Sequence, residues 1–406
     1  MPARGDAESR SKRSGNLASR LKFGTKLREA VLCFIAGLAV SIIFYPINFP
    51  FYSFIALIPI LWISYFLGPG SFWKGYFFGF GHFVSCFAWL NEVFPGSSFG
   101  LALAYSFLTA SWNFLTTRLL FNLDYGKLKD LAPKNAKEPL YPDTFTIGKV
   151  IFFCGLSAAI WVCMESVRSI IFTGLPWNQL GACLWAYPRL ISIVSFTGIY
   201  GLSFIIVFVN LNLFLILRNI YLIKKKNHPE RFFNKKQCLP LLILVALFVV
   251  PVHTWESSEN IRVALIQGNI PLEQMYNSNP KKALENLKLS EETYKELTFM
   301  AADEKPDLII WPETALPRAL RPGEPLMREI FNRVECPMII GTVRRELRDG
   351  TKGLLIDDYR QYNSAIYFDE AGRVIDKYSK IHIVPFGEYT PFKDLWPKKI
   401  LKYIYM

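Results

Sequence analysis

Two carboxylates and one lysine in the last third of the chain are the side chains best suited to do chemistry. Glu313 follows an apolar run and a Trp-Pro pair, in the stretch LIIWPETALP at residues 308–317. Lys380 lies at the end of another predicted strand, and Glu388 follows it eight residues later. A carboxylate can take a proton from a nucleophile, and an ammonium group can stabilise the oxyanion of a tetrahedral intermediate. These residue types therefore suit acyl transfer.

The same residues have a plainer interpretation. A glutamate after a strand is usually a solvated loop residue, and a surface ion pair between Lys and Glu is common. However, α/β folds place their chemistry at the carboxyl ends of strands, where Glu313 falls. Spacing alone leaves both interpretations open.

The surrounding segment, from about residue 255 onward, alternates between apolar runs and amphipathic stretches. Three stretches are typical of strands, namely 261–270, 306–313 and 336–345. Residues 279–304 and 325–334 are typical of helices, and residues 363–384 predict a hairpin that turns at 370–372. This alternation predicts an α/β sheet with helices packed on it.

The first 254 residues have the composition of a membrane protein. The chain of 406 residues is 51% hydrophobic and 16% aromatic, which exceeds globular composition. Seven runs are candidates for spanning helices, which need about 20 apolar residues: 30–48, 50–67, 75–93, 98–119, 149–171, 190–217 and 239–254. We expect a basic tail (1–29), a multi-pass α-helical membrane domain (30–254) and an α/β domain (255–406).

The distribution of positive charge predicts how these helices cross the membrane. The tail 1–29 carries eight Lys and Arg residues, and every second loop after it is basic. Lys74 supplies the charge of the loop after the second span, and Arg218 and Lys224 belong to the loop after the sixth. Because cytoplasmic loops collect Lys and Arg, we expect a cytoplasmic N-terminus and an extracytoplasmic 255–406 domain. The net charge of +13 then reflects topology, and nucleic-acid binding is not predicted.

The cysteines and histidines predict no metal site, cofactor or disulfide framework. Seven cysteines are scattered without a C-x-x-C pair, and the chain has four histidines. Cys336 is the one cysteine of the 255–406 domain, and we interpret it as a small packed residue at the start of a strand.

Several motifs resemble known families. WPETALP (311–317) and KIHIVPFGEY (380–389) are similar to the Glu and Lys motifs of the nitrilase, or carbon–nitrogen hydrolase, superfamily, which VALIQGNIP and YNSAIYF also fit. In the apolar half, WVCMESVRSIIFTGLPWNQLG and GIYGLSFIIVFVN resemble the apolipoprotein N-acyltransferase family. The resemblance extends from about residue 30 to 400.

This resemblance implies a fold, a reaction and a location. The 255–406 domain would be an αββα sandwich facing the periplasm, attached to the bacterial inner membrane. The family transfers an acyl chain from a phospholipid to the N-terminal diacylglyceryl cysteine of an apolipoprotein, by ping-pong chemistry through a cysteine thioester. By motif match, Glu313 is the general base, Lys380 the oxyanion stabiliser and Glu388 a supporting carboxylate. The implied partners are the phospholipid donor, the apolipoprotein acceptor and the membrane, with no cofactor.

The chain departs from the family pattern after the lysine. The family's nucleophilic cysteine follows several dozen residues later in a C-Y-E context, whereas this chain ends at Met406, 26 residues after Lys380. The family's final span also lies beyond that point. We therefore expect a C-terminally truncated chain that is inactive alone.

Four more residues are candidates for substrate binding: Tyr276, Glu165, Arg168 and Trp177. Glu165 and Arg168 lie one turn apart in a predicted span, so they form either an ion pair reaching the interface or a site for a lipid head group or the outer domain. Tyr276 either lines an acyl pocket or is an ordinary loop residue. Trp177 belongs to the GLPW part of the family motif.

Other functions remain open at this point. A membrane-tethered nitrilase-type amidase would use the same Glu-Lys-Cys site on soluble amides, and a catalytically dead fragment would keep the fold alone. A transporter or receptor would need paired polar residues in the middle of several spans, but these spans are rich in Phe and Leu. The acyltransferase interpretation is favoured.

Overall fold

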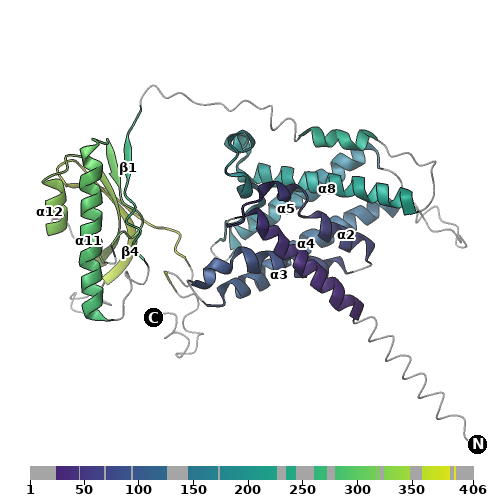
Figure 1. The fold of residues 1–406 in the computed structure, drawn as a ribbon, viewed down its shortest axis with the longest axis horizontal. Helices are drawn as coiled ribbons and strands as arrows, with labels where there is room; N and C mark the ends of the chain where they lie inside the picture. Colours follow the sequence, from purple (N-terminus) through teal and green to yellow (C-terminus); the bar gives the residue numbers. More distant parts are fainter. Residues whose placement is uncertain are drawn as a thin grey trace, which may run out of the picture. The chain divides into compact units, whose positions relative to one another are not determined.

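The protein was analysed as a computed structural model. It describes residues 24–44, 46–67, 70–92, 95–125, 145–171, 174–225, 235–243, 260–271, 279–316, 318–320, 324–347, 359–384 and 388–389. The chain divides into two compact units, Met1–Thr254 and Trp255–Met406, which run from purple to teal and from green to yellow in Figure 1.

The described part of the first unit is helical. A helix over residues 24–40 leads into the 3₁₀ turns η1 (Ser41–Ile43) and η2 (Pro50–Phe54). The main helices that follow are α2 (Ile58–Phe66), α3 (Ser71–Cys86), α4 (Ser97–Tyr125), α5 (Ile147–Arg168) and α8 (Ile199–Lys225). Short helical segments join them: η3 (Ala88–Glu92), η5 (Leu180–Leu184), α6 (Pro188–Ile191), α7 (Val194–Thr197) and η6 (Lys235–Leu241).

Two helices in the described ranges, α5 and residues Ile199–Lys224 of α8, are long and apolar enough to cross a membrane. Two other expected spans are not single helices. In 50–67, η2 ends at Phe54 and α2 begins at Ile58. The helix is interrupted there because Pro59, in the first turn of α2, has no N–H to continue a preceding helix. In 190–217, the chain turns at Gly198, which has φ +63°, so the long helix begins only at Ile199. Most of 239–254 lies outside the described residues.

Helix α3 lies close to two neighbours because glycines face them. A Cβ atom on Gly79 would lie 2.9 Å from Cβ of Thr109 in α4. One on Gly81 would lie 2.2 Å from the carbonyl oxygen of Phe34 in the first helix. Small residues let helix backbones approach closely where apolar surroundings give little other driving force for association.

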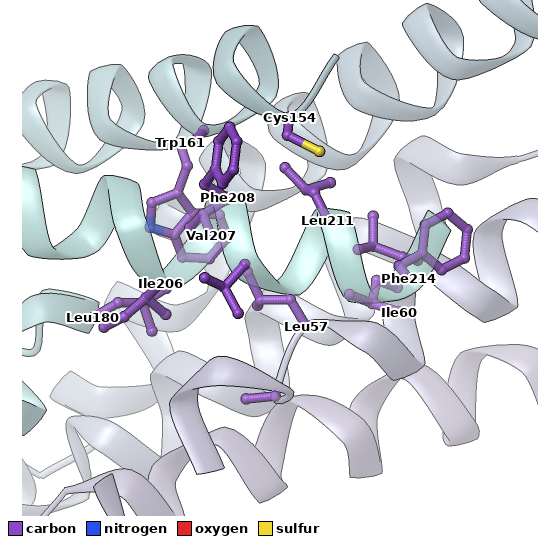
Figure 2. Packing of buried hydrophobic residues seen from close by; sticks show 14 of the residues in the cluster. Leu57, Ile60, Cys154, Trp161, Leu180, Ile206, Val207, Phe208, Leu211 and Phe214 are labelled. Atoms are coloured by element: carbon purple, nitrogen blue, oxygen red, sulfur yellow. The ribbon is translucent and has the colours of Figure 1, made fainter. Parts of the chain in front are cut away.

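The apolar core of this unit lies around α8. Side chains from α8 pack against the start of α2 and against α5, as Figure 2 shows. The labelled residues are Leu57, Ile60, Cys154, Trp161, Leu180, Ile206, Val207, Phe208, Leu211 and Phe214. Asn210 secures the same contact, because its side chain accepts the Leu57 N–H at 2.9 Å and donates to the Ser53 carbonyl at 2.7 Å.

A fully buried ion pair joins α4 to α8. Arg218 Nη1 lies 3.1 and 2.9 Å from the carboxylate oxygens of Asp124, and the Tyr65 hydroxyl donates to Asp124 at 2.7 Å. The sequence-based assignment of Arg218 to a loop is therefore wrong, because the helix continues past it and its side chain turns inward. Lys74 is also no loop residue, since it lies in the first turn of α3 and pairs with Glu29 at 3.1 Å.

We expect Arg218→Met to lower the free energy of unfolding of the first unit by about 3–5 kcal/mol, because it leaves the Asp124 carboxylate buried without its cation. The double variant Asp124→Leu with Arg218→Met should recover most of this loss. Thermal unfolding in detergent, followed by tryptophan fluorescence, measures both. Wild-type stability of the single variant would show that the pair is not buried as described.

The second unit contains a five-stranded sheet in the order β1-β2-β3-β4-β5. The strands are β1 (Val263–Leu265), β2 (Leu308–Ile310), β3 (Met338–Leu347), β4 (Tyr359–Phe368) and β5 (Val374–Ser379). The first three strands run parallel to one another, and β4 pairs antiparallel with both β3 and β5. The expected hairpin is present between β4 and β5, with Gly372 in its turn at φ +73°.

Two helices, α11 (Pro280–Asp303) and α12 (Pro325–Phe331), pack on this sheet. The side chain of Asn279 caps α11 by accepting the N–H groups of Lys281 and Lys282 at 3.0 and 3.4 Å. Core residues from α12 and the strands, such as Ile330, Ile309 and Met338, are completely buried. The described residues form one sheet, so the two-sheet αββα sandwich remains a prediction.

Candidate active site

Glu313 lies on a sharp turn directly after β2. Trp311 fixes the start of this turn, because its ring is 2% exposed and its Nε1–H donates to Thr298 of α11 at 2.9 Å. Thr314, the residue after Glu313, has φ +48°, a left-handed conformation that is costly for a β-branched residue. Such strain often occurs where the backbone must present a functional side chain.

The turn lies directly against β3, and a glycine makes this contact possible. A Cβ atom on Gly341 would lie 2.1 Å from the Pro312 carbonyl oxygen and 2.8 Å from Cα of Glu313. The Ala315 N–H donates to the Gly341 carbonyl at 3.0 Å. Any larger residue at position 341 would therefore push the Glu313 turn away from the sheet.

Lys380 follows the last residue of β5, and its backbone N–H donates to the Asn363 carbonyl at 2.7 Å. Asn363 lies in β4, opposite Val343 of β3. Its side chain is therefore held between the end of β5 and the Glu313 turn by the strand register.

These elements bring Glu313, Lys380 and Glu388 together. Lys380 Nζ lies 2.9 Å from Oε1 of Glu313 and 3.0 Å from Oε1 of Glu388. The Asn363 Nδ2 amide group donates to Glu388 at 2.9 Å and also to Glu313. Two carboxylates, one ammonium group and one amide therefore form a single polar cluster.

The two carboxylates have different surroundings. Both oxygens of Glu388 accept hydrogen bonds, since Oε2 takes the Val384 N–H at 2.7 Å. The bonds that Glu313 accepts from described residues all use Oε1, and its side chain is 63% exposed against 25% for Glu388. Glu313 is thus placed to act on an incoming group, and Glu388 is placed to hold Lys380.

The contacts within the cluster also shift the pKa values of Lys380 and Glu388. Partial burial by itself would lower the pKa of Lys380, but the hydrogen bonds that it donates to Glu313 and Glu388 outweigh this effect and raise the pKa. Burial would likewise raise the pKa of Glu388, but bonds from Asn363, Val384 and Lys380 lower it. Lys380 is therefore a cation and Glu388 an anion at neutral pH, which suits electrostatic stabilisation of an oxyanion by the lysine.

Asn363 is the member of the cluster to which the sequence analysis assigned no role. It lies in the YNSAIYF stretch, and the available signal was its position in a predicted hairpin strand leading to Lys380. An asparagine in a strand carries no functional signal of its own. Only the pairing of the strands in the folded structure shows that Asn363 reaches both carboxylates.

The other predicted site residues lie elsewhere or outside the described residues. Tyr276 is among the residues that are not described. Trp177 is 42% exposed, and its ring packs edge-on against Trp89 at 4.8 Å. Cys336 donates to the Pro306 carbonyl at 3.2 Å, so it lies at the start of β2 and not at the Glu313 end. Within the described ranges, no group of three or more His, Cys, Asp or Glu side chains could hold a metal ion.

Glu165 and Arg168 are both buried, and the ion pair that was one of the two alternatives for them does not form. Glu165 instead accepts the Trp161 Nε1–H at 2.9 Å and the Leu180 N–H at 3.0 Å. Oε2 of Glu165 and Nη1 of Arg168 have no hydrogen-bond partner among the described residues. Both residues line a cavity of about 20 Å³, which has room for a water molecule.

Comparison with known proteins agrees with the two units. Residues 36–212 match the model of the apolipoprotein N-acyltransferase N-terminal domain, and residues 262–398 match the carbon-nitrogen hydrolase model. The apolipoprotein N-acyltransferase of Rickettsia prowazekii (strain Madrid E) is 27% identical over 92% of this chain and 69% of its own length. That of Geobacter metallireducens is 32% identical over 59% of this chain and 44% of its own length.

The carbon-nitrogen hydrolase match and the similarity to these relatives define an acyltransferase that contains a carbon–nitrogen hydrolase domain. The match of the helical unit narrows this class. The chain belongs to the apolipoprotein N-acyltransferase family.

We expect Gly341→Ala to displace the Glu313 turn and to cost about 1–3 kcal/mol of stability, as overpacking does. The displaced turn should lose the Ala315–Gly341 hydrogen bond. Hydrogen exchange followed by mass spectrometry should therefore show faster exchange in a peptide covering 311–316, with a peptide from α11 as the control. Unchanged exchange in the 311–316 peptide would contradict the close contact.

Proposed function

We propose that this protein transfers an acyl chain from a phospholipid to the α-amino group of the N-terminal, diacylglyceryl-modified cysteine of apolipoproteins. The observation that supports this most directly is the contact of Lys380 with Glu313 and Glu388, at 2.9 and 3.0 Å, at the carboxyl edge of a carbon-nitrogen hydrolase sheet. The attached helical unit distinguishes the proposal from a soluble amidase, because it matches the N-terminal domain model of the family.

In the first half-reaction, the exposed Glu313 accepts the proton of a cysteine thiol. The thiolate attacks the ester carbonyl of the phospholipid, and the ammonium group of Lys380 stabilises the tetrahedral oxyanion. The carbon–oxygen ester bond then breaks, and the lysophospholipid alkoxide leaves with the proton from Glu313. The acyl chain remains on the enzyme as a thioester.

In the second half-reaction, the α-amino group of the apolipoprotein attacks the thioester. Glu313 takes a proton from the attacking amine, and Lys380 again faces the oxyanion. The carbon–sulfur bond breaks, an amide forms and the thiol is regenerated. Glu388 keeps Lys380 in place throughout, because its own carboxylate takes no proton in either half-reaction, and Asn363 in turn holds Glu388.

The nucleophile has to be a cysteine other than Cys336. Cys336 is buried beside Pro306, at the opposite end of β2 from Glu313. Pro306 precedes Glu313 by about seven residues, which is roughly 20 Å along an extended chain. Burial also raises the pKa of the Cys336 thiol, which disfavours the thiolate. The proposal therefore requires another cysteine to reach the exposed side of Glu313.

The proposed location is the bacterial inner membrane, with several membrane-crossing helices, a cytoplasmic N-terminus and the second unit in the periplasm. Helices α5 and α8 support membrane insertion. The orientation is supported by positive charge: the Asp124–Arg218 pair joins the ends of α4 and α8, and the sequences after both ends are rich in lysine. The inward-facing Arg218 no longer contributes to that count, but Lys224 and the residues after it do.

We expect Glu313→Gln and Lys380→Ala to lower the acylation rate by about 10²–10⁴-fold, the usual contribution of a general base or an oxyanion stabiliser. Both side chains lie at the surface, so thermal stability should change little. The assay uses the native protein extracted from its own membranes, a phospholipid with a labelled acyl chain and a diacylglyceryl peptide. Mass spectrometry detects the amide-linked acyl chain.

Lys377→Ala is a matched control, since this exposed lysine lies in β5, three residues before Lys380, and contacts Glu346 at 3.8 Å instead of the cluster. Its acylation rate should equal the wild-type rate. Near-normal rates in Glu313→Gln or Lys380→Ala would refute the assignment of the site. Hydrolysis of soluble amides without phospholipid would favour the amidase instead.

A further inference from the structure

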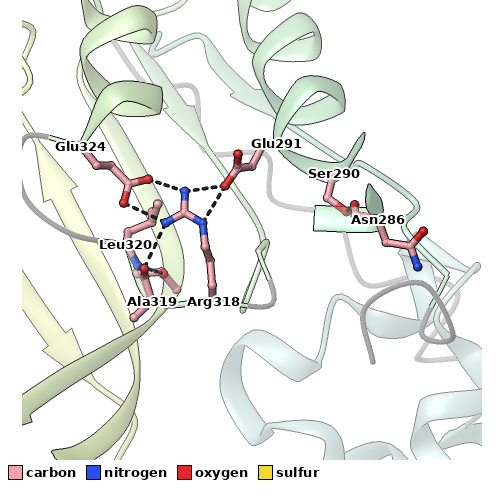
Figure 3. Close-up of polar contacts among 8 residues, drawn as sticks. Asn286, Ser290, Glu291, Arg318, Ala319, Leu320 and Glu324 are labelled. Atoms are coloured by element: carbon pink, nitrogen blue, oxygen red, sulfur yellow. Dashed lines mark hydrogen bonds and ion pairs between the residues drawn. The ribbon is translucent and has the colours of Figure 1, made fainter. Parts of the chain in front are cut away.

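Arg318 forms a dense set of polar contacts five residues after Glu313, shown in Figure 3. Its Nε and Nη2 atoms lie 2.6 and 2.5 Å from Oε1 of Glu291. Its Nη1 and Nη2 atoms donate to the two carboxylate oxygens of Glu324 at 2.8 and 2.5 Å. Nη1 also donates to the Ala319 carbonyl at 3.1 Å. The guanidinium group thus engages two carboxylates at once.

These contacts join three segments of the second unit. Glu291 lies in the middle of α11, Glu324 is the residue that precedes α12, and Arg318 lies on the chain that leaves the Glu313 turn. All three side chains are largely covered, with exposed fractions of 28% for Arg318, 24% for Glu291 and 10% for Glu324. Such sheltered, two-oxygen contacts hold geometry far better than an exposed single ion pair.

The segment fixed by Arg318 is itself bonded to the strand beside the active site. Ala319 forms a parallel bridge with Val343 of β3, and the Leu320 N–H faces the Thr342 hydroxyl at 3.4 Å. Val343 in turn pairs with Asn363, the residue that donates to both carboxylates of the cluster. A shift of the 318–320 segment would therefore act on Glu313 from two sides, through the turn and through β3.

We propose that Arg318 is a positioning residue that fixes the exit of the Glu313 turn and thereby keeps the Glu313 carboxylate on Lys380. This positioning role rests on the proposed function in one respect only, namely that the Glu313 carboxylate serves as the base in acyl transfer. The strained backbone of Thr314 explains why the turn needs a contact at each end, because a turn with φ +48° at a threonine relaxes unless both of its ends are held. Trp311 holds the entrance, and Arg318 holds the exit.

An arginine is needed at this position because of its shape. A planar guanidinium group can place separate N–H groups on two carboxylates and a carbonyl, whereas a lysine ammonium group is a single point of charge. Arg318→Lys should therefore fail to restore the geometry although it keeps the charge. Glu291→Gln weakens one carboxylate contact and leaves the contact with Glu324, so its effect should be smaller than that of Arg318→Gln.

The first test measures Lys380 without using enzyme activity. The purified native protein is treated with limiting acetic anhydride at pH 9, and acetylation of Lys380 is compared by mass spectrometry with that of the exposed Lys305. Loss of the Glu313 contact lowers the pKa of Lys380, and each unit of decrease raises the reactive neutral fraction about tenfold while the pH is below the pKa. We expect Arg318→Gln to raise Lys380 labelling several-fold, towards the value for Glu313→Gln.

The matched control is Lys295→Gln. Lys295 of α11 also joins this helix to α12, since it lies 2.9 Å from Glu329, but it has no bond to any described residue of the 313–320 segment. Labelling of Lys380 should stay at the wild-type value in this variant. If acetylation of Lys380 increased equally in Lys295→Gln and Arg318→Gln, Arg318 would act only by connecting α11 to α12, and the proposal would be overturned.

The second test is the acylation assay. Arg318→Gln should lower kcat by about tenfold or more, with little change in the KM for phospholipid, because it displaces the base without touching the substrate site.

The positioning role would be refuted if Lys380 were acetylated at the wild-type level in Arg318→Gln while its acetylation was raised in Glu313→Gln. If the wild-type protein shows no acylation, the proposed function fails, and the labelling experiment still decides the role of Arg318.

Discussion

The ammonium group of Lys380 holds two carboxylates that would otherwise repel each other at the edge of the sheet. Glu313 and Glu388 come from different segments, one after β2 and one after β5, and they meet only because Lys380 and Asn363 lie between them. Like charges this close raise each other's pKa unless cations or N–H donors compensate. The second unit can therefore be understood as a set of elements that keep these donors in register.

Each neighbouring element meets part of that requirement. The antiparallel register of β3, β4 and β5 places Asn363 beside the end of β5. Gly341 lets the Glu313 turn lie directly on β3, and Trp311 anchors the turn to α11. The exposed side of Glu313 is left as the open side of the cluster, where a nucleophile and a substrate carbonyl can approach.

The first unit follows a different constraint, since polar groups buried among apolar helices need partners. Asp124, Arg218 and Tyr65 satisfy one another between α4, α8 and α2, and Asn210 satisfies backbone groups at the start of α2. These bonds add direction to apolar packing that has little direction of its own. Some buried atoms still find no hydrogen-bond partner among the described residues, including Nε of Arg218, and Oε2 of Glu165 and Nη1 of Arg168 beside the small cavity.

Much of the second unit was predictable because local patterns decide it. The apolar run before Glu313, the capped helix after Asn279 and the turn at Gly372 each carry their own signal of period, cap or backbone freedom. The helical unit was harder to predict. Hydropathy does not distinguish one continuous helix from η2 followed by α2, or a lipid-facing arginine from one paired in the core, as Arg218 is.

The amino-acid sequence by itself determined the kinds of residue available for chemistry, the motifs that indicate the family and the order of the strands and helices around Glu313 and Lys380. Only the tertiary structure decided which groups meet. Asn363, Gly341 and Arg318 are ordinary residues in the sequence, and their roles come from contacts between segments 20 or more residues apart. Strand register and helix packing set those contacts through many weak interactions, and no local pattern records their sum.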